Sequence, residues 1–364
     1  MRLNDRIRAW LGRLRRVEQS PPQKRRGPVD HVVILDGTMS SLRDGWETNA
    51  GLTYKLLRER MPNAALSVRY EAGIQWRDWS STRDVIEGRG INRQIQRAYG
   101  ALASRYRPGD RIFLFGYSRG AYAVRSLAGV IDRVGLLTDR QATMRNIQQA
   151  YRHYRLAPHS PTARAFRNRF CHAQVPIEMV GCWDTVKALG LRAPFVWKLT
   201  EPAHAFHNTE FCAAVRAGYH ALAADETREA YAPVLWTTPP EFTGRLEQMW
   251  FPGAHGDVGG QLEGFTAARP LANLSLAWML GHAARHGLSL PADWQARFPL
   301  DPAAPSQGTM RGWGKLFLAR RAREMGRDPS ECLHPVLRQT RPDLVARFQR
   351  QRGPAARAAR TVRI

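Results

Sequence analysis

The sequence predicts a doubly wound α/β fold, in which a mostly parallel sheet carries helices on both faces. Short apolar runs at residues 32–35, 112–115 and 246–251 have the length and composition of buried strands. Between them, apolar residues recur at helical spacing, and we expect helices over residues 47–60 and 91–106. Strands that alternate with helices of this length form parallel sheets, because each crossover places a helix on one face of the sheet.

The strand predicted at 112–115 leads directly into a serine turn. Residues 116–120, Gly-Tyr-Ser-Arg-Gly, fit the G-x-S-x-G nucleophile elbow, which holds a serine on a strained turn between a strand and a helix. Small flanking residues allow the backbone to fold this tightly. Apolar residues at helical spacing follow as far as Ile131, so the order is strand, serine turn and helix, as an α/β hydrolase requires. The alternative is a glycine-rich turn with an incidental serine.

The remaining elements complete a single large domain with basic ends. We expect strands near residues 66–70 and 175–180, a helix over 271–284, and a last strand at 246–251. Residues 188–217 have poor periodicity, which predicts an insertion or lid. Three parts of the chain are predicted: a basic N-terminal segment and linker at 1–30, a hydrolase domain at 31–340 and a basic tail at 341–364.

The charge is concentrated at the two ends of the chain. The 364 residues carry a net charge of +24, nearly all of it from arginine. Residues 1–28 hold nine Arg or Lys against Asp5 and Glu18, and residues 341–364 hold seven Arg against Asp343. Basic ends of this kind indicate an anionic partner, such as lipid headgroups, nucleic acid or an acidic protein.

The first sixteen residues have an amphipathic helical pattern. Their apolar side chains share one face, and most of their arginines lie elsewhere; the apolar set is Leu3, Ile7, Trp10, Leu11 and Leu14. Such a helix suits an anionic membrane surface, with tryptophan at the interface. Packing against the protein's own domain or against a partner fits the same pattern equally well.

Several classes of protein are disfavoured by what the sequence lacks. The four cysteines have no C-x-x-C spacing, so we expect free thiols in a reducing compartment, and neither a metal site nor a redox motif. There is no apolar run long enough to span a bilayer and no secretory signal, which predicts a cytoplasmic or peripheral membrane protein or export by a signal-less route. The terminal arginines are not interleaved with aromatic residues, so specific nucleic-acid binding is not expected.

A serine nucleophile needs a histidine base held by a carboxylate, and in this fold the acid and the base follow later strands in that order. Asp184 comes shortly after the strand predicted at 175–180, and His255 shortly after the strand at 246–251. The carboxyl ends of parallel strands meet at one edge of the sheet, where sites of α/β proteins form. Ser118, Asp184 and His255 are therefore the predicted triad.

Other residues of the right chemistry compete for these roles. Asp225, Glu226 or Asp257 could supply the acid, and His220 could be the base. A structural role, such as a helix cap or a backbone hydrogen bond, is open to each of them.

The oxyanion hole is predicted from the geometry of the elbow. One donor is the backbone N–H of Arg119, the residue after the nucleophile, and the second comes from a loop after an early strand. The loop at Gly37 and Thr38, which follows Asp36, is the best candidate. The alternative for Asp36 to Thr38 is a simple turn.

Five blocks of the sequence occur in the order of one known family: VVILDGTMSS (32–41), FGYSRGAYAVRSLAG (115–129), GCWDTV (181–186), HALAADE (220–226) and FPGAHGDVGG (251–260). They resemble an α/β-hydrolase family that includes the catalytic domains of type VI secretion phospholipase effectors of the first lipase class. The resemblance covers about residues 31–340. It implies Ser118 as nucleophile, Asp184 as acid and His255 as base, and ester hydrolysis on lipid-like substrates without metal or diffusible cofactor.

Two blocks depart from the family pattern. Met39-Ser40 stands where the family usually has a Trp-Asn type pair, and residues 73–76 replace a G-V-G-T-like loop. Both departures are expected to change the acyl pocket. The leading hypothesis is a phospholipase-like acyl-ester hydrolase, the second a soluble esterase or thioesterase with the same triad, and the third a non-catalytic binding module with basic tails.

Overall fold

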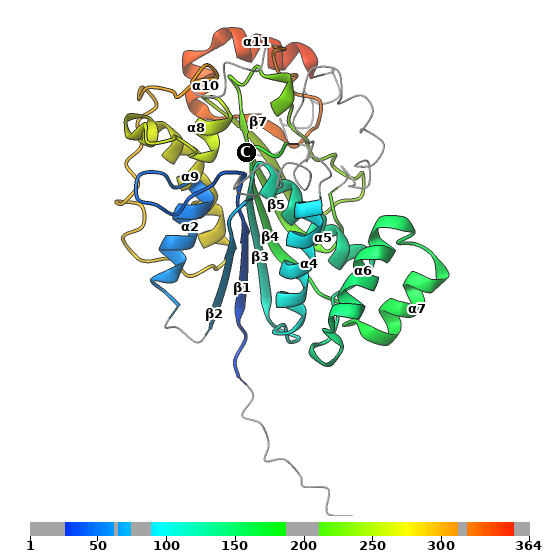
Figure 1. Cartoon of the computed structure of the whole chain (residues 1–364). Helices are drawn as coiled ribbons and strands as arrows, with labels where there is room; N and C mark the ends of the chain where they lie inside the picture. Colours follow the sequence, from blue (N-terminus) through cyan, green and yellow to red (C-terminus); the bar gives the residue numbers. More distant parts are fainter. Residues whose placement is uncertain (1–25, 62–64, 74–88, 187–210, 312–318, 353–364) are drawn as a thin grey trace, which may run out of the picture.

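The computed structural model describes residues 26–61, 65–73, 89–186, 211–311 and 319–352. A seven-stranded, all-parallel sheet in the order β2-β1-β3-β4-β5-β6-β7 runs through its centre (Figure 1). The strands are β1 (Asp30–Leu35), β2 (Leu66–Glu71), β3 (Arg111–Tyr117), β4 (Ile177–Trp183), β5 (Val215–Ala223), β6 (Arg245–Phe251) and β7 (Glu331–Leu333). The predicted doubly wound α/β fold is confirmed.

The central strands are apolar on both faces because helices cover both. Along β3, Ile112 and Leu114 contribute to one hydrophobic core, and Phe113 and Phe115 to the other. Successive side chains of a strand point to opposite faces, so a strand that is buried on both sides is a continuous apolar run. This explains why the run at 112–115 has no polar residue.

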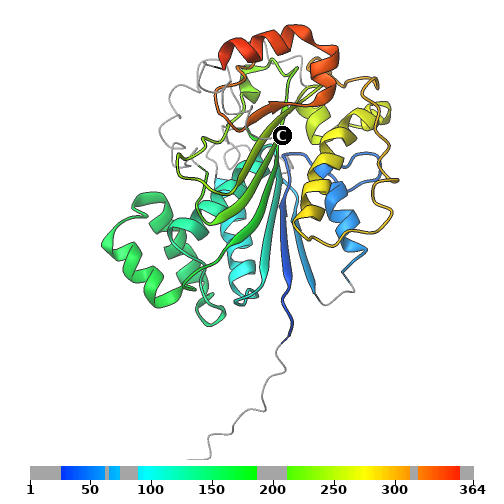
Figure 2. The same cartoon turned by 180° about the vertical axis from the view of Figure 1, so that it is seen from behind.

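Helices α4, α5, α6 and α7 lie on one side of the sheet, and α2, α8 and α9 on the other, as two opposite views show (Figures 1 and 2). Their bounds are α2 (Asn49–Arg58), α4 (Arg89–Ala103), α5 (Arg119–Arg133), α6 (Met144–Leu156), α7 (Pro161–Phe170), α8 (His255–Gly259) and α9 (Arg269–Arg285). The predicted helices at 47–60, 91–106 and 271–284 correspond to α2, α4 and α9.

From β1 the chain first adds β2 on one side and then returns to add β3 on the other, so the order of the strands reverses between β1 and β3. In open α/β sheets a crevice forms outside the carboxyl ends of the strands at such a reversal, and ligands bind there. Ser118 follows β3 and Asp36 follows β1, so the residues after both strands meet at this switch point.

Two strands differ from the sequence prediction. The segment predicted as an insertion or lid at 188–217 overlaps β5, because Val215 and Ala217 are buried strand residues; residues 187–210 lie outside the described part. The strand at 246–251 is not the last, since β7 pairs with β6 beyond it. β7 has three residues, too few for periodicity to reveal.

The end of the chain packs on the sheet edge. Helices α10 (Pro335–Thr340) and α11 (Pro342–Gln351) follow β7, and Leu344 and Phe348 of α11 are buried with Trp250 and Leu333. Part of the segment predicted as a basic tail is therefore a folded helix. Residues 353–364 are outside the described part.

The start of the domain is fixed at the end of the sheet opposite Ser118. The buried carboxylate of Asp110 accepts hydrogen bonds from both terminal nitrogens of Arg26, at 3.0 and 2.7 Å, and from the Val29 N–H at 2.9 Å, and it contacts His31 Nε2 at 2.9 Å. Burial alone would raise the pKa of Asp110, but these contacts lower it to about 2. A cavity of about 330 Å³ adjoins this cluster, remote from the serine turn.

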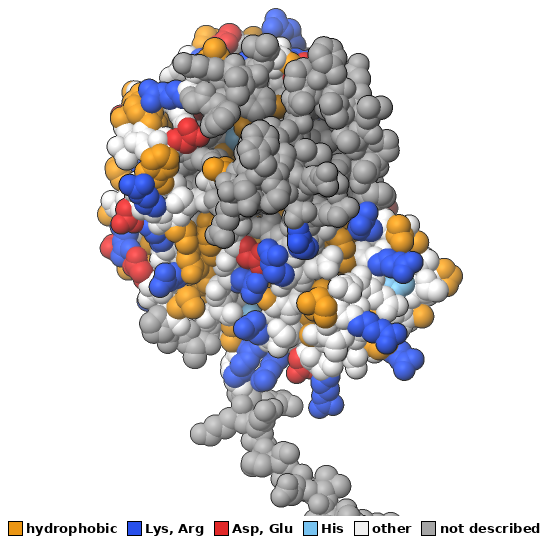
Figure 3. Space-filling model, in the orientation of Figure 1, with side chains coloured by type: hydrophobic (Ala, Val, Ile, Leu, Met, Phe, Trp, Pro, Cys, Tyr) orange, Lys and Arg blue, Asp and Glu red, His pale blue; other side chains and the backbone are white. Residues whose placement is uncertain are grey.

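Arginine and lysine side chains gather over the lower half of the molecule in the view of Figure 3, around α4, α6 and α7. Residues 140–177 contain seven arginines and no aspartate or glutamate. The segment that carries α6 and α7 is therefore strongly basic.

The glycine after the elbow serine leaves no room for a side chain. A Cβ on Gly120 would lie 2.5 Å from the Asp36 carbonyl oxygen and closer still to that of Leu35. We expect Gly120→Ala to lower the free energy of unfolding by about 2 kcal/mol or more, because backbone must move. Gly281→Ala on α9 is the matched control, since its Cβ would meet only Arg285 Nη1 at 3.9 Å. It should be neutral or stabilising by up to about 1 kcal/mol. Urea unfolding of both variants measures the difference, and equal stabilities would contradict the expectation.

Candidate active site

The backbone at Ser118 has the strained geometry of a nucleophile elbow. Its φ and ψ are 55° and −120°, a conformation that non-glycine residues rarely adopt. The turn is fixed by the Ser118 N–H, which donates to the Trp183 carbonyl oxygen at 2.9 Å, and by the close approach of Gly116 to the backbone of Ala121. Ser118 thus lies between the end of β3 and the first turn of α5.

His255 reaches Ser118 from the turn after β6. Gly253 has a φ of +100°, and α8 begins at His255. The imidazole Nε2 lies 3.0 Å from Ser118 Oγ, a hydrogen-bond distance. The ring is buried, and its backbone N–H donates to Glu226 Oε2 at 3.2 Å.

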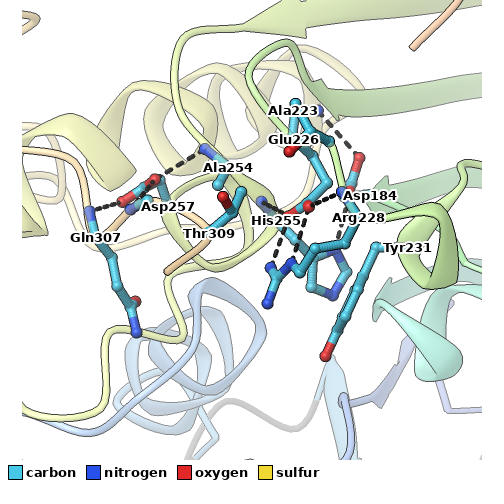
Figure 4. Close-up of polar contacts among 12 residues, drawn as sticks. Asp184, Ala223, Glu226, Arg228, Tyr231, Ala254, His255, Asp257, Gln307 and Thr309 are labelled. Carbon is cyan, nitrogen blue, oxygen red and sulfur yellow. Dashed lines mark hydrogen bonds and ion pairs between the residues drawn. The ribbon is translucent and has the colours of Figure 1, made fainter. Parts of the chain in front are cut away.

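Asp184 approaches the other side of the same imidazole. It follows β4 with a φ of 40°, and its Oδ2 lies 2.6 Å from His255 Nδ1 (Figure 4). Its Oδ1 accepts from the Ala223 N–H at 3.0 Å. The structure therefore brings the three residues of the predicted triad together in one hydrogen-bonded chain.

A fourth residue, which sequence reasoning did not identify, holds the carboxylate. Arg323 donates from Nη1 to Asp184 Oδ1 at 2.6 Å and from Nη2 to Oδ2 at 2.8 Å. Burial of Asp184 alone would raise the pKa of its carboxyl, but the charge and hydrogen bonds of Arg323, together with His255, outweigh burial and hold the pKa well below its usual range. An arginine among many, far along the chain, carries no local sequence signal.

Two tyrosine rings contact the imidazole. Tyr117 stacks on His255 with ring centroids 4.9 Å apart, and Tyr231 lies 4.7 Å away at 55°. The guanidinium of Arg228 lies over the Tyr231 ring and pairs with Glu226 at 2.6 Å. These aromatic contacts fix the plane of the histidine ring. Tyr117 lies inside the elbow motif, whereas nothing in the sequence singles out Tyr231.

The competing acids have other partners. Asp257 accepts from the backbone N–H groups of Ala254 and Gln307, at 2.8 and 2.6 Å, and its side chain points away from the imidazole (Figure 4). Asp225 accepts from the Gly253 N–H and pairs with Arg341, both at 2.7 Å. Glu226 holds the His255 backbone rather than its ring. All three shape the turn that carries His255.

The competing base, His220, faces the backbone beside Asp184. It is fully buried in β5, and its Nε2 accepts from the Thr185 N–H at 3.0 Å. Burial and the charge of Arg125 lower its pKa to about 3, so the ring is neutral at pH 7. Its Nδ1 is then a donor, 3.4 Å from Gln248 Oε1.

Asp36 fixes the loop predicted to complete the oxyanion hole. Its buried carboxylate accepts from the Gly37 N–H, the Thr48 hydroxyl and the Tyr70 hydroxyl, each at 2.7 Å. The Gly37 N–H is therefore engaged with Asp36. A Cβ on Gly37 would lie 3.4 Å from Ser118 Cβ, so the loop borders the serine. The N–H groups of Thr38 and Arg119 remain the candidates, and that of Arg119 lies in the first turn of α5, where helices leave amides without an intrahelical partner.

The arrangement has the parts that acyl transfer needs: a hydroxyl on a strained turn, a base within hydrogen-bond reach and a carboxylate that orients the base. In the part of the chain that the structure describes, no group of three or more His, Cys, Asp or Glu side chains could hold a metal ion.

The all-parallel sheet and the serine turn at its switch point define a protein of the α/β-hydrolase type. Residues 30–282 match the family described as the catalytic domain of Tle1-like type VI secretion system phospholipase effectors. The chain belongs to this family.

Individual relatives are distant. An uncharacterized protein of Saccharomyces cerevisiae, YEL023C, is 29% identical over 161 residues, which are 41% of this chain and 22% of that protein. An uncharacterized Pseudomonas aeruginosa protein of known structure has 16% identity and a TM-score of 0.44, over 75% of this chain and 49% of that one. The Tle1 effector bound to the VgrG spike has 18% identity and a TM-score of 0.36, over 65% and 51%. The chain thus spans about half of each solved structure and about a fifth of the yeast protein.

The buried Asp36 makes stability depend on pH. Burial raises its pKa from 3.8 to about 6, against the opposing hydrogen bonds, so the folded state holds the proton more tightly than the unfolded state. Its contribution is complete below 3.8 and is lost as the pH rises through about 6. In Asp36→Asn the side-chain amide can donate its N–H groups to the two hydroxyl oxygens and carries no titrating proton. We expect the free energy of unfolding of this variant to rise by about 3 kcal/mol relative to wild type across this pH window. Urea unfolding at pH 4 to 7 measures it, and a pH-independent difference would contradict it.

Proposed function

We propose that the protein is a serine hydrolase that cleaves the acyl esters of phospholipids through an acyl-enzyme on Ser118. The observation that carries the proposal is the hydrogen-bonded chain from Ser118 Oγ to His255 and Asp184 at the carboxyl edge of the sheet. Membership of the phospholipase effector family supports the choice of a lipid ester. It also supports delivery through a type VI secretion system, which needs no cleavable signal.

The reaction proceeds in two halves. Ser118 Oγ attacks the ester carbonyl carbon while His255 Nε2 takes the hydroxyl proton, and Asp184 stabilises the imidazolium that forms. The N–H groups of Arg119 and Thr38 stabilise the oxyanion. The carbon–oxygen bond to the alcohol breaks, and the imidazolium protonates the leaving oxygen. Water then attacks the acyl carbon while His255 Nε2 takes its proton; the bond from the acyl carbon to Ser118 Oγ breaks, the imidazolium returns the proton to Oγ, and the fatty acid is released.

The decisive test compares Ser118→Ala with Ser126→Ala, a buried serine of α5 that donates to the Tyr122 carbonyl oxygen. Loss of the nucleophile should lower kcat at least about a thousandfold, whereas Ser126→Ala should keep most activity. Fatty acid release from anionic phospholipid vesicles and hydrolysis of a short-chain soluble ester are the two assays.

The pattern of results separates the candidate functions. Serine-dependent release from vesicles supports a phospholipase. Serine-dependent cleavage of the soluble ester alone would reject the phospholipase and support the soluble esterase. Equal activity of Ser118→Ala and wild type would sink the triad, and a folded wild type inactive on both substrates would favour the binding module.

The basic N-terminal segment is proposed to attach the enzyme to anionic lipid. Among the residues that the structure describes, no helix is long and apolar enough to cross a membrane. Residues 1–16, which lie outside them, have the composition of an interfacial helix. β1 starts at the end of the sheet opposite Ser118, so this segment joins the domain far from the site and would act as a tether.

Deletion of residues 1–25 tests the tether without disturbing the domain, because Arg26 and its contact with Asp110 are kept. We expect binding to vesicles of anionic phospholipid to fall at least about tenfold, from the loss of several basic charges, with kcat on the soluble ester unchanged. Vesicle sedimentation measures the binding, and vesicles of neutral lipid are the control. Unchanged binding would remove the segment from the mechanism.

A further inference from the structure

The carboxylate of Asp184 lies between two cationic partners that come from distant parts of the chain. His255 follows β6, whereas Arg323 lies in the segment 319–325, which precedes β7 and is beyond the matched residues 30–282. Asp184 has no exposed surface, and the Arg323 side chain is 3% exposed. The pair is therefore shielded from solvent. Charges in such an interior interact more strongly than in water.

Arg323 makes four hydrogen bonds, and each one restrains a part of the site. Two are the parallel bonds to the Asp184 oxygens, a fork geometry that fixes a carboxylate plane. The other two go to backbone carbonyl oxygens, of Ala223 at 2.9 Å and of Tyr231 at 2.5 Å. The Ala223 N–H also binds Asp184, and the Tyr231 ring contacts His255.

The segment that carries Arg323 is itself tied to the chain around Tyr231. The Arg321 N–H donates to the Thr227 carbonyl oxygen at 2.7 Å, and the Glu229 N–H donates to that of Ala319 at 3.1 Å. Beyond it, the Gly326 N–H donates to Glu331 of β7 at 2.8 Å. Arg323 is thus held on both sides.

We propose that Arg323 is a positioning residue: it holds Asp184 and Tyr231 against His255 and offsets part of the charge that Asp184 presents to the imidazole, so that the segment after the family domain completes the active site. This inference rests on the proposed function. A carboxylate that faces only histidine stabilises the imidazolium with its full charge. Here the guanidinium binds both oxygens of the carboxylate and offsets part of that charge.

Other charged and titratable groups surround His255 and must be held constant in the test. They face it or its partners from β3, β5, α5 and the chain after β5: Tyr117, Arg119, His220, Glu226, Arg228 and Tyr231. Within the described chain, Arg323 alone donates two hydrogen bonds to the Asp184 carboxylate.

The test compares three variants by the pH dependence of kcat/KM on the soluble ester. In Arg323→Met the acidic limb of the pH profile of kcat/KM should move to higher pH by about one unit, because a positive charge near the imidazole is lost. Arg323→Lys keeps the charge and loses the fork, so its limb should stay while kcat falls about tenfold at unchanged KM. The control is Arg269→Met, which removes a largely buried arginine that binds Asn49 and the carbonyl oxygens of Glu47 and Gly260. Its limb should stay in place.

Each result decides the proposal. An unmoved limb in Arg323→Met, or an equal shift in Arg269→Met, would overturn it. Should Arg323→Met fail to fold, Arg323→Lys decides: kcat within twofold of wild type would also overturn it.

A readout without turnover separates this inference from the proposed function. Histidine NMR of the full chain, with His255→Gln to assign the signal, follows the imidazole titration directly. Its midpoint should rise by about one pH unit in Arg323→Met and stay in Arg269→Met. A shift by NMR with activity retained in Ser118→Ala would reject the hydrolase mechanism and keep the electrostatic role of Arg323. No shift would reject that role whatever Ser118→Ala shows.

Discussion

Removing the charge of Asp184 from water is costly unless nearby groups compensate it, and much of the site is arranged around that compensation. The carboxylate receives two hydrogen bonds from Arg323, one from the Ala223 N–H and one contact with His255. These partners come from the segment before β7, from β5 and from the turn after β6. The requirement to satisfy one buried anion therefore couples three regions that are far apart in the chain.

Strain at Ser118 is the second constraint, and neighbouring backbone maintains it. The serine keeps a positive φ because Gly116 and Gly120 let α5 approach the ends of β3 and β1 within contact distance. Such conformations persist only where the surroundings over-determine them. The hydrogen bond from Ser118 N–H to Trp183 then ties the elbow to β4, the strand that delivers Asp184.

Buried polar residues that resemble catalytic groups act here as scaffold. His220, kept neutral by burial, accepts from the N–H after Asp184, and Asp36 gathers two hydroxyls and a backbone N–H at the switch point. Asp257 joins the turn of His255 to residues 306–308. Each fixes the backbone beside a candidate catalytic residue.

The sequence by itself determined the strand–serine–helix elbow, the α/β class and the order of Ser118, Asp184 and His255, because these features depend on local periodicity and on which residues follow strands. It favoured His255 as the base but left His220 open as an alternative, and only the packing shows which ring faces Ser118. Only the tertiary structure revealed strands β5 and β7 and showed where Arg323 and Tyr231 lie. Their roles come from contacts between residues distant in sequence, and such contacts leave no pattern in a single chain.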